Sequence, residues 1–407
     1  MYAMCSIISK NYLAHARTLA QSFLRHHPTG KAFILLTDEG EGQIPAQGEP
    51  FEWVYVRDIG LPDADSLRFR YDVVEFNTAV KPFLMEYLFV SRGVDKLVYL
   101  DPDILITQRM DELFRLMDRT SIVLTPHILT PMKDDGLRPS ETDLLQAGIY
   151  NLGFLALTRS AEAMRLLGWW KARLLAYCLM KPESGYHVDQ RWMDFVPALF
   201  ENVHILKSCG YNAAYWNLHE RTVASEDGMF LVNGEPLLFY HFSGFTADLS
   251  QISRHQTRFS WEQVPGLRPL FLQYARRLAE NGHATLSSLG YTYGFFDNQV
   301  RIPPFVREVY RKLGEEAKRF GNPFATLDPG GFYQWLFFPQ RSPTGLPRLL
   351  HEIYETRPDL QRAFPSPTGA QRGEFLKWAR PFIPLEYGVE PKLWNPVMDV
   401  AMTRPFG

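Results

Sequence analysis

The sequence predicts an α/β protein built on a mostly parallel sheet and followed by a helical region. Over residues 1–250, short apolar and β-branched runs alternate with segments whose apolar residues repeat at helical spacing. One run, 95–100, ends in Asp101-Pro102-Asp103, which places two carboxylates in a turn at the carboxyl edge of the predicted sheet. Beyond residue 250 the strand-like runs give way to helical patterns separated by Pro and Gly.

The first elements are expected in the order strand, helix, strand, strand. Residues 2–9 are largely apolar and predict a buried strand, and 11–27 carry the apolar stripe of an amphipathic helix. A second strand is expected over 31–37, where Asp38-Glu39-Gly40 stops it, and a third over 51–56. A β-α-β order predicts parallel strands joined by right-handed crossovers.

The same alternation continues through the rest of this region. The expected elements are a helix over 76–92, the strand 95–100, a helix over 110–117, a strand over 121–125, a surface loop over 132–143, a strand over 149–158 and a helix over 160–180. Helices over 264–281, 304–319 and 345–356 follow. We therefore expect a doubly wound nucleotide-binding domain over 1–250 and a helical C-terminal extension over 251–407, to which we assign no chemical role.

Composition excludes several classes of protein. The chain has 407 residues, enough for two or three domains, and a net charge of -2, which gives no electrostatic case for nucleic acid binding. Its three cysteines are widely spaced, which argues against a disulfide framework and favours a reducing, cytoplasmic compartment. The opening residues 1–10 lack the basic start of a signal peptide, and no apolar run approaches the ~20 residues of a transmembrane segment.

The Asp101-Pro102-Asp103 turn is the first candidate site. Two carboxylates one residue apart, at the mouth of an open α/β sheet, can share one hard divalent cation such as Mn²⁺ or Mg²⁺. Such a cation is suited to neutralising a diphosphate, which makes a nucleotide sugar a candidate ligand. Two Asp residues are also common in ordinary turns, and that alternative stays open here.

Several motifs in this chain resemble those of one enzyme family. Asp95–Thr107 (DKLVYLDPDILIT) resembles the DxD region of GT-A glycosyltransferases, and in particular their retaining, family-8-like group. The resemblance covers residues 1 to roughly 250. The further matching segments, in chain order, are Cys5-Ser6-Ile7 through Asn11-Tyr12 (opening strand and nucleotide-binding turn), Tyr150-Asn151-Leu152-Gly153-Phe154 (beside the donor sugar), His187-Val188-Asp189-Gln190 (an Asp-Gln element) and His241-Phe242-Ser243-Gly244-Phe245 (a late His-x-x-Gly motif).

The resemblance implies a metal-dependent hexosyltransferase. The donor would be a nucleotide diphosphate sugar, most simply a UDP-sugar, and transfer would retain the anomeric configuration. The acceptor would be a glycan, lipid-linked or protein substrate. The metal ligands would be Asp101, Asp103 and His241; carboxylates and an imidazole suit Mn²⁺ or Mg²⁺. One departure stands out: the His-x-x-Gly motif lacks the family's Lys-Pro-Trp continuation, so a phosphate-binding lysine from that loop is in doubt.

Further donor contacts are expected from five positions. Ser6, Asn11 and Tyr12 belong to the segment that resembles the nucleotide-binding turn. Asp38, at the end of the second strand, is placed to meet the ribose or base, or is a turn residue. Lys81 could reach the phosphates as a point charge, or could be a lysine on the surface of its helix.

Three residues are expected beside the sugar or the bound donor. Asn151 could hydrogen-bond a sugar hydroxyl, with simple turn chemistry as the alternative, and Gly153 would leave space for the sugar ring. Gly244 would let the backbone turn closely beside a ligand.

Asp189 and Gln190 are the candidates for the reacting centre. A front-face route would use them to orient and stabilise the sugar, while the leaving phosphate accepts the acceptor's proton. A covalent route would make Asp189 the nucleophile. We favour the front-face route. The competing interpretation is that Asp189 only caps the following helix.

Further residues are candidates for the site, and two other functions are alternatives to glycosyl transfer. His127 is placed to line the site, and Tyr211, Asn212 and 216–221 could form an acceptor wall. A nucleotidyltransferase that makes sugar nucleotides would share the sheet and the metal, but the turn Ser9–Tyr12 has no glycine to cradle a triphosphate. A catalytically silent binding or scaffold protein, with the helical tail as its working part, is the other alternative.

Overall fold

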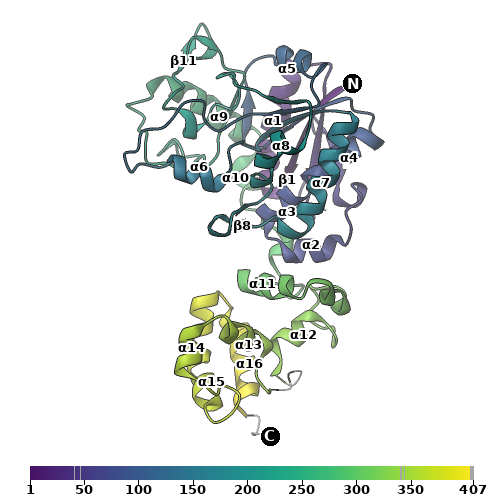
Figure 1. Cartoon of the computed structure of the whole chain (residues 1–407), viewed down its shortest axis with the longest axis vertical. Coiled ribbons are helices and arrows are strands. Elements are labelled where there is room, and N and C mark those ends of the chain that lie inside the picture. The colour runs from purple at the N-terminus through teal and green to yellow at the C-terminus, as the bar shows by residue number, and fades with distance from the viewer. Residues whose placement is uncertain (41, 46, 340–341, 343, 404–407) are drawn as a thin grey trace. The chain divides into compact units, whose positions relative to one another are not determined.

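A computed structural model describes residues 1–40, 42–45, 47–339, 342 and 344–403. Its contacts divide the chain into two units (Figure 1). The first unit comprises Met1–Pro62 and Val74–Gly290, and the second comprises Asp63–Val73 and Tyr291–Gly407. The chain thus divides at Gly290, in place of residue 250, and a short early segment joins the second unit.

A seven-stranded sheet forms the centre of the first unit, in the order β10-β6-β7-β4-β1-β2-β3. Neighbouring strands are parallel except where β7 pairs antiparallel with β4 and with β6. The predicted α/β fold with a mostly parallel sheet is confirmed. The strand bounds are β1 Tyr2–Ile8, β2 Lys31–Leu36, β3 Glu52–Tyr55, β4 Lys96–Leu100, β6 Ile122–Leu124, β7 Phe154–Thr158 and β10 Val203–Ile205.

The central strands are apolar because both faces of the sheet are covered. All residues of β1 after Tyr2 are buried, and the four residues of β4 after Lys96 are buried as well. Strands buried on both faces read as continuous apolar runs without alternation, which is the pattern of YAMCSII and KLVYL. The carboxyl ends of these two parallel strands lie at one edge of the sheet, where the site is found.

The helices of the first unit follow the predicted order, with one division. The helix expected over 76–92 is two helices, because Pro82 occupies the second position of α4 and is suited to a first helical turn. The expected loop 132–143 ends where α6 begins at Glu141. The helix bounds are α1 Leu13–His26, α3 Val73–Ala79, α4 Lys81–Ser91, α5 Asp111–Leu116, α6 Glu141–Ala147, α7 Ala161–Tyr177, α8 Val196–Leu199, α9 Arg268–Glu280 and α10 His283–Leu286.

Small sheets complete the first unit and carry parts of the site. β5 (Ile104–Ile106) pairs antiparallel with β14 (Phe239–His241), and β8 (Met180–Lys181) with β9 (Tyr186–His187). A three-stranded sheet contains β11 (Val223–Glu226), β12 (Met229–Val232) and β13 (Glu235–Pro236). The segment 235–241 is therefore divided between two sheets, with Glu235–Pro236 in one and Phe239–His241 in the other.

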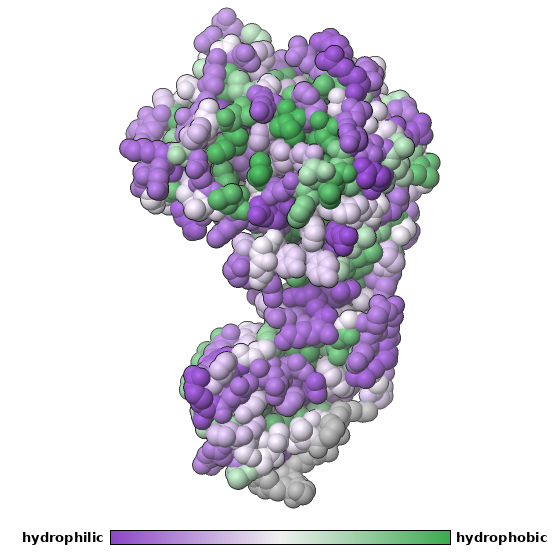
Figure 2. Space-filling view, in the orientation of Figure 1, coloured by the Kyte–Doolittle hydropathy of each residue, from purple (hydrophilic) through white to green (hydrophobic). Residues whose placement is uncertain are grey.

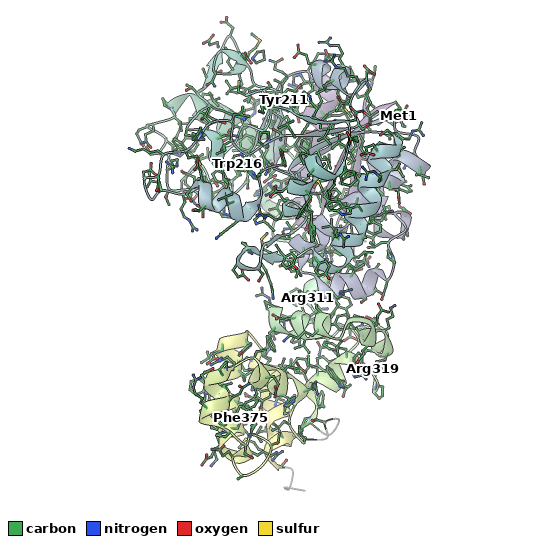
Figure 3. All side chains as sticks on the ribbon, in the orientation of Figure 1. Met1, Tyr211, Trp216, Arg311, Arg319 and Phe375 are labelled. Atoms are coloured by element: carbon green, nitrogen blue, oxygen red, sulfur yellow. The ribbon has the colours of Figure 1, made fainter. Side chains whose placement is uncertain are left out.

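The second unit is helical, as the sequence predicts for the C-terminal region. Its core contains Phe69, Phe332 and Phe375, the last of which is labelled in Figure 3. Within this unit Arg307 donates hydrogen bonds to the carbonyl oxygens of Phe69 (2.9 Å) and Tyr71 (2.8 Å) at the end of α2. Residues 404–407 of the predicted extension lie outside the described residues. The helix bounds are α2 Ala64–Arg70, α11 Pro304–Lys312, α12 Phe332–Phe337, α13 Arg348–Glu355, α14 Pro358–Ala363, α15 Arg372–Tyr387 and α16 Pro391–Thr403.

The surface combines apolar and polar side chains. Figure 2 shows hydrophobic residues gathered in the middle of the visible face of the first unit, with hydrophilic residues around them. Across the part of the chain that the structure describes, no helix combines the length and apolar character needed to cross a bilayer.

Candidate active site

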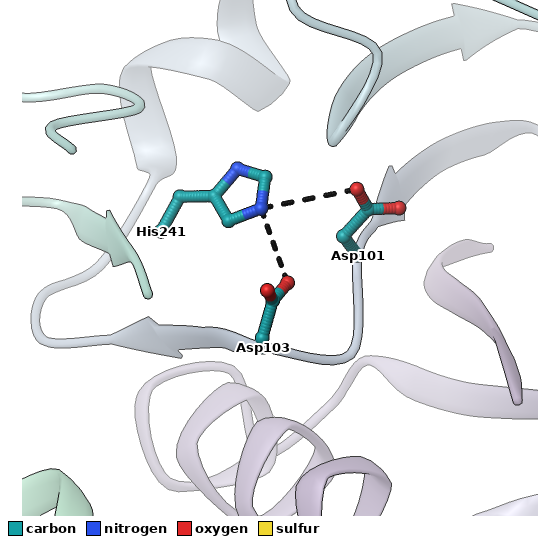
Figure 4. A group of neighbouring side chains, drawn as sticks. All are labelled: Asp101, Asp103 and His241. Carbon is teal, nitrogen blue, oxygen red and sulfur yellow. Dashed lines mark ion pairs between the residues drawn. The ribbon is translucent and has the colours of Figure 1, made fainter. Parts of the chain in front are cut away.

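Two strand ends and one neighbouring strand bring Asp101, Asp103 and His241 together (Figure 4). β4 ends just before Asp101, and a tight turn, in which Ile104 N–H donates to the Asp101 carbonyl (3.2 Å), leads into β5. In the β5–β14 pair His241 lies opposite Ile104, so its ring comes beside the turn. His241 Nε2 is 3.1 Å from Asp103 Oδ1 and 3.8 Å from Asp101 Oδ2. The three predicted metal ligands thus form one group.

The electric environment of this group favours a cation. Burial disfavours the charged form of His241, but Asp103 and Asp101 outweigh it and raise the pKa of His241 above its usual value. Burial likewise opposes charge on Asp103, yet His241 holds the pKa of that carboxyl below its usual value. A proton on the imidazole supplies positive charge between two carboxylates, and a divalent cation would replace it there.

The donor set fits Mn²⁺ or Mg²⁺. Two carboxylates and one imidazole nitrogen offer ligand atoms that all lie within 4.8 Å of one another. The carboxylate side chains are 30% and 22% exposed, which leaves one side of the group open for further ligands. His241 Nδ1 is buried and has no hydrogen-bond partner among the described residues. His241 Nε2, in contrast, faces the carboxylates of Asp101 and Asp103.

Gly153 makes room for the imidazole of His241. A Cβ atom at position 153 would lie 2.3 Å from His241 Cε1 and 2.7 Å from its Nδ1. Gly153 also accepts a hydrogen bond on its carbonyl from Asp101 N–H (2.8 Å). We expected this glycine to leave space for a sugar ring, but in the structure the imidazole fills that space, since protein interiors pack without gaps.

Lys81 is buried and engaged with carboxylates. Its Nζ lies 2.8 Å from Asp189 Oδ2 and 3.8 Å from Asp101 Oδ1, and it donates to the Leu152 carbonyl (2.9 Å). The Lys81 and Asp189 side chains are each 2% exposed. The alternative of a lysine on the surface of its helix is therefore wrong. A role at the phosphates stays a prediction.

Burial and the Lys81–Asp189 ion pair have opposing effects on the pKa of each of the two side chains. Burial lowers the pKa of Lys81, but Asp189 and Asp101 raise it by more, and the lysine stays charged. Burial raises the pKa of Asp189 against the opposing effect of Lys81. Asp189 is also not a helix cap, because the short helical turn Arg191–Phe195 starts after Gln190 and has no side-chain cap. The sequence could not show that Asp189 pairs with Lys81, because Lys81 lies 108 positions earlier in the chain.

Asn151 and Gln190 form an amide network behind the acidic group. Asn151 Oδ1 accepts from Gly153 N–H (3.2 Å) and from Asn212 Nδ2 (3.1 Å). Gln190 Oε1 accepts from Leu152 N–H (2.9 Å) and from Asn151 Nδ2 (3.3 Å). These bonds use the Asn151 amide within the protein, so its observed contacts support the turn. Contact with a sugar hydroxyl stays a prediction.

A cavity of about 730 Å³ opens in front of these groups. Predicted residues from four separate motifs line it, together with residues from the loop before α6 and from the segment after β14. The lining residues include Lys81, Asp101, Asp103, Arg138, Asn151, Gly153, Asp189, Gln190, Trp216, His241 and Arg254.

Four predicted donor contacts, which lie on β1 or in the segments that follow β1 and β2, do not line this cavity. Ser6 is buried within β1, and its Oγ has no hydrogen-bond partner among the described residues. Asn11 accepts a hydrogen bond from Ser9 Oγ (2.6 Å), and the Tyr12 ring stacks on His15 at a centroid distance of 4.6 Å. Asp38 is buried 3.6 Å from Lys10 Nζ. Their nucleotide contacts stay predictions.

The predicted acceptor wall is partly a structural core. Trp216, labelled in Figure 3, lines the cavity and packs edge-on against His241 at 5.1 Å. His127 lines the cavity as well. Tyr211 instead packs among core aromatic rings, and Arg221 is buried, donating to the Tyr211 carbonyl (2.6 Å). Of the wall, Trp216 is therefore the residue with access to a ligand.

Sequence reasoning missed three cavity or support residues. Tyr99 Oη donates to Asp101 Oδ1 (2.7 Å), and a tyrosine two residues before the acidic turn was a usable signal, since alternate strand residues share a face. Arg138 and Arg254 line the cavity from loops. Neither arginine belongs to a motif, so their position depends on how distant loops meet.

Comparisons with known proteins find relatives at low identity. No family model matches the chain. Two uncharacterized proteins of Bacillus subtilis are similar: YfnF is 29% identical over 250 residues, 60% of this chain and 81% of that protein, and YfnD is 26% identical over 247 residues, 59% and 77%.

Solved structures with similarity to this chain include several transferases. The galactosyltransferase LgtC, in complex with donor and acceptor sugar analogs, has 14% identity and a TM-score of 0.39, with 71% of this chain and 97% of that chain covered. The glycosyltransferase GlyE of Streptococcus pneumoniae has 17% identity and a TM-score of 0.39, covering 72% and 66%. Mouse xyloside xylosyltransferase 1 has 14% identity and a TM-score of 0.35, covering 59% and 97%.

Proposed function

We propose that this protein is a metal-dependent glycosyltransferase. It would transfer a hexose-type sugar from a nucleotide diphosphate donor, most simply a UDP-sugar, to a glycan, lipid-linked or protein acceptor. The observation that carries the proposal is the group Asp101, Asp103 and His241, which sits at the carboxyl edge of the sheet and opens on a cavity of about 730 Å³. Open α/β sheets bind their ligands at that edge.

A bound divalent cation would supply one part of the chemistry. When bound to Asp101, Asp103 and His241, Mn²⁺ or Mg²⁺ would act as a Lewis acid toward the negative charge on the departing diphosphate. The protein holds the ligands ready for it: Tyr99 Oη fixes Asp101, and Gly153 lets the imidazole stand beside both carboxylates. Preorganised ligands need little rearrangement when charge develops.

Asp189 and Gln190 would act on the sugar. Both line the cavity, and Lys81 holds the Asp189 carboxylate in place at 2.8 Å. The Gln190 side chain is fixed by the Leu152 N–H, which it accepts at 2.9 Å, and by the Ala147 carbonyl, to which it donates at 3.0 Å. These contacts support an orienting role for the two residues.

We propose transfer with retention by the front-face route. The bond between sugar C1 and the diphosphate oxygen breaks, and the bond from C1 to the acceptor oxygen forms on the same face. The acceptor's proton passes to the released diphosphate oxygen. The ion pair to Lys81 favours Asp189 as a fixed charge beside the sugar over a nucleophile that must reach C1.

A panel of nucleotide sugars incubated with and without Mn²⁺ tests the proposal. We expect Mn²⁺-dependent release of the nucleoside diphosphate from one or a few donors. Absence of release from every donor, with a folded protein, would instead support the silent binding or scaffold alternative. Release of pyrophosphate from a nucleoside triphosphate would identify a nucleotidyltransferase.

The cell compartment is part of the same proposal. Cys5, Cys178 and Cys209 are all free thiols in the structure. Free cysteines are compatible with a reducing compartment, and we retain the prediction of a cytoplasmic enzyme.

A further inference from the structure

The cavity contains three cationic side chains, and they differ in how their charge is used. Lys81 already pairs with Asp189 at 2.8 Å and Asp101 at 3.8 Å. Arg138 pairs with Asp143 at 3.0 Å. Arg254 lines the same cavity, and no carboxylate of the described residues forms an ion pair with it.

The cavity histidines other than His241 add no comparable charge. Burial lowers the pKa of His127 to about 4, and burial followed by Arg191 lowers that of His187. Burial and then the nearby Arg254 lower the pKa of His255. Arg254 is therefore the cavity cation whose charge no side chain of the described residues neutralises.

The backbone holds Arg254 beside the turn that carries His241. Arg254 N–H donates to the Gly244 carbonyl (3.0 Å), and Ser253 Oγ donates to the Ser243 carbonyl (2.9 Å). Gly244 has a φ of +73°, and a Cβ atom there would lie 2.4 Å from Ser253 Oγ. This glycine, which we expected to lie beside a ligand, permits the close approach of the segment that bears Arg254.

A second anchor fixes the other end of the same segment. Thr257 N–H donates to the Arg138 carbonyl (2.9 Å), and Arg138 N–H donates to Thr257 Oγ1 (3.0 Å). Arg258 pairs with Asp135 at 2.7 Å and also donates to the Pro139 carbonyl. Because both ends are tied down, the backbone at Arg254 has a defined position at the cavity.

Arg254 lines the same cavity as Asp101 and Asp103, and the Tyr12 phenol interacts with both Arg254 and Asp103. Burial raises the pKa of the Tyr12 phenol, and Asp103 adds to that effect while Arg254 opposes it. One phenol thus senses both the guanidinium and the acidic group. A ligand that bridges Arg254 and a cation held by the acidic group would need negative charge at both ends.

We propose that Arg254 binds the diphosphate of the nucleotide donor and balances the charge that the metal leaves uncompensated. This inference rests on the proposed function and identifies a residue that positions the leaving group. A guanidinium matches phosphate oxygens with two parallel N–H donors, which a lysine cannot do. Arg254 would also supply the phosphates with the positive charge that Lys81, which is paired with Asp189 and Asp101, does not offer.

Affinity measurements on three forms of the full chain test this role. The wild type, Arg254→Gln and the control Arg173→Gln, which removes an exposed arginine on α7, are titrated with Mn²⁺ alone and then with UDP, GDP, ADP and CDP at saturating Mn²⁺. We expect Arg254→Gln to weaken the tightest diphosphate by roughly 10- to 100-fold, as expected for loss of a hydrogen bond to a charged group. Mn²⁺ affinity and the control should match the wild type, and Arg254→Lys should recover part of the loss.

The outcomes separate this inference from the proposed function. If the wild type binds a diphosphate with Mn²⁺ and Arg254→Gln binds it equally well, the Arg254 role is wrong while the proposed function stands. If the wild type binds none of the four diphosphates, both are overturned. If Arg254→Gln loses Mn²⁺ itself, its effect is structural and the role is rejected.

Discussion

The imidazole ring of His241 occupies the space where a side chain at position 153 would lie. The geometry of the site therefore depends on the contact between these two residues. The missing side chain at Gly153 allows the imidazole to approach both acidic residues, because a Cβ would lie 2.3 Å from Cε1. The neighbours of the ring are Trp216 at 5.1 Å and the Asp103 carboxylate at 3.1 Å. The ring therefore has little room to move away from an added methyl group.

Gly153→Ala should reduce Mn²⁺ affinity at least about tenfold while leaving the protein folded, because the methyl group displaces the imidazole from the carboxylates. Gly168→Ala on α7 is the matched control, since a Cβ there meets nothing within 4 Å. That control should keep Mn²⁺ affinity and gain about 0.5–1 kcal/mol of stability, as expected for alanine in a helix. Titration calorimetry and thermal unfolding measure both. Equal Mn²⁺ affinity in Gly153→Ala and wild type would refute the role assigned to His241.

The buried pair Lys81–Asp189 makes a different kind of contribution. A buried ion pair adds little net stability, but removing one partner leaves an uncompensated charge in the interior. In this protein the ion pair holds the Asp189 carboxylate at the wall of the cavity that Asp101 and Asp103 also line. Removing one partner should therefore lower the free energy of unfolding more than replacing both partners.

Lys81→Met should lower the free energy of unfolding by roughly 3–5 kcal/mol, and the double variant Lys81→Met/Asp189→Leu should recover most of that loss. Lys171→Met is the control, because its pair with Glu86 is half-exposed and should cost less than about 1 kcal/mol. Urea denaturation measures all three. A single variant as stable as the double would mean that Asp189 finds another partner or water.

Strands and their ends were the part of the molecule that sequence could predict. β1, β2 and β4 are apolar runs with clear stops, so their positions and the acidic turn after β4 could be read directly. The antiparallel direction of β7 could not be read, because an apolar run has the same composition in either direction. The amide network of Asn151 and Gln190 was hidden for a related reason, since it joins residues 39 positions apart.

The end of α1 has a further consequence for stability. His27 follows this helix, and its Nε2 accepts a hydrogen bond from Met110 N–H (3.0 Å), which requires the neutral ring. Burial, followed by repulsion from Arg109, lowers the pKa of His27 to about 4 in the folded protein. The unfolded chain has the ordinary value of about 6.5. Between these values the unfolded chain takes up a proton that the folded chain does not.

The free energy of unfolding should therefore fall as the pH drops from about 6.5 to about 4, and the His27 contribution should level off below that. In His27→Gln the slope over this range should be shallower by up to about 1.4 kcal/mol per pH unit, since one titrating group is removed. Chemical denaturation at a series of pH values measures the slope. An unchanged slope would mean that His27 takes up its proton equally in both states.

The division of the whole chain differs from the one that composition suggested. The sequence changes character near 250, but α9 follows that point and packs in the first unit: Tyr274 stacks on Phe242 at a centroid distance of 3.7 Å. The segment 63–73 belongs to the second unit, where Phe69 is part of the core. Composition could not show either exchange, because both depend on contacts between segments far apart in the chain.

A chain shortened to residues 1–250 should therefore unfold without a cooperative transition, whereas one shortened to 1–290 should keep such a transition. The reason is that the shorter chain exposes Phe242 and loses the buried side chains Phe271 and Tyr274 of α9. Thermal unfolding followed by circular dichroism compares the two. Equal cooperativity would place the boundary of the first unit at 250 after all.

The proposed activity as a whole depends on one divalent cation held by Asp101, Asp103 and His241. Its most direct test is a Mn²⁺ titration followed by electron paramagnetic resonance, on the wild type and on Asp103→Asn. We predict one Mn²⁺ site in the wild type, tightened by UDP, and an affinity at least about 100-fold weaker in a folded Asp103→Asn, because a carboxylate ligand is lost. Equal Mn²⁺ binding by the two proteins would contradict the account.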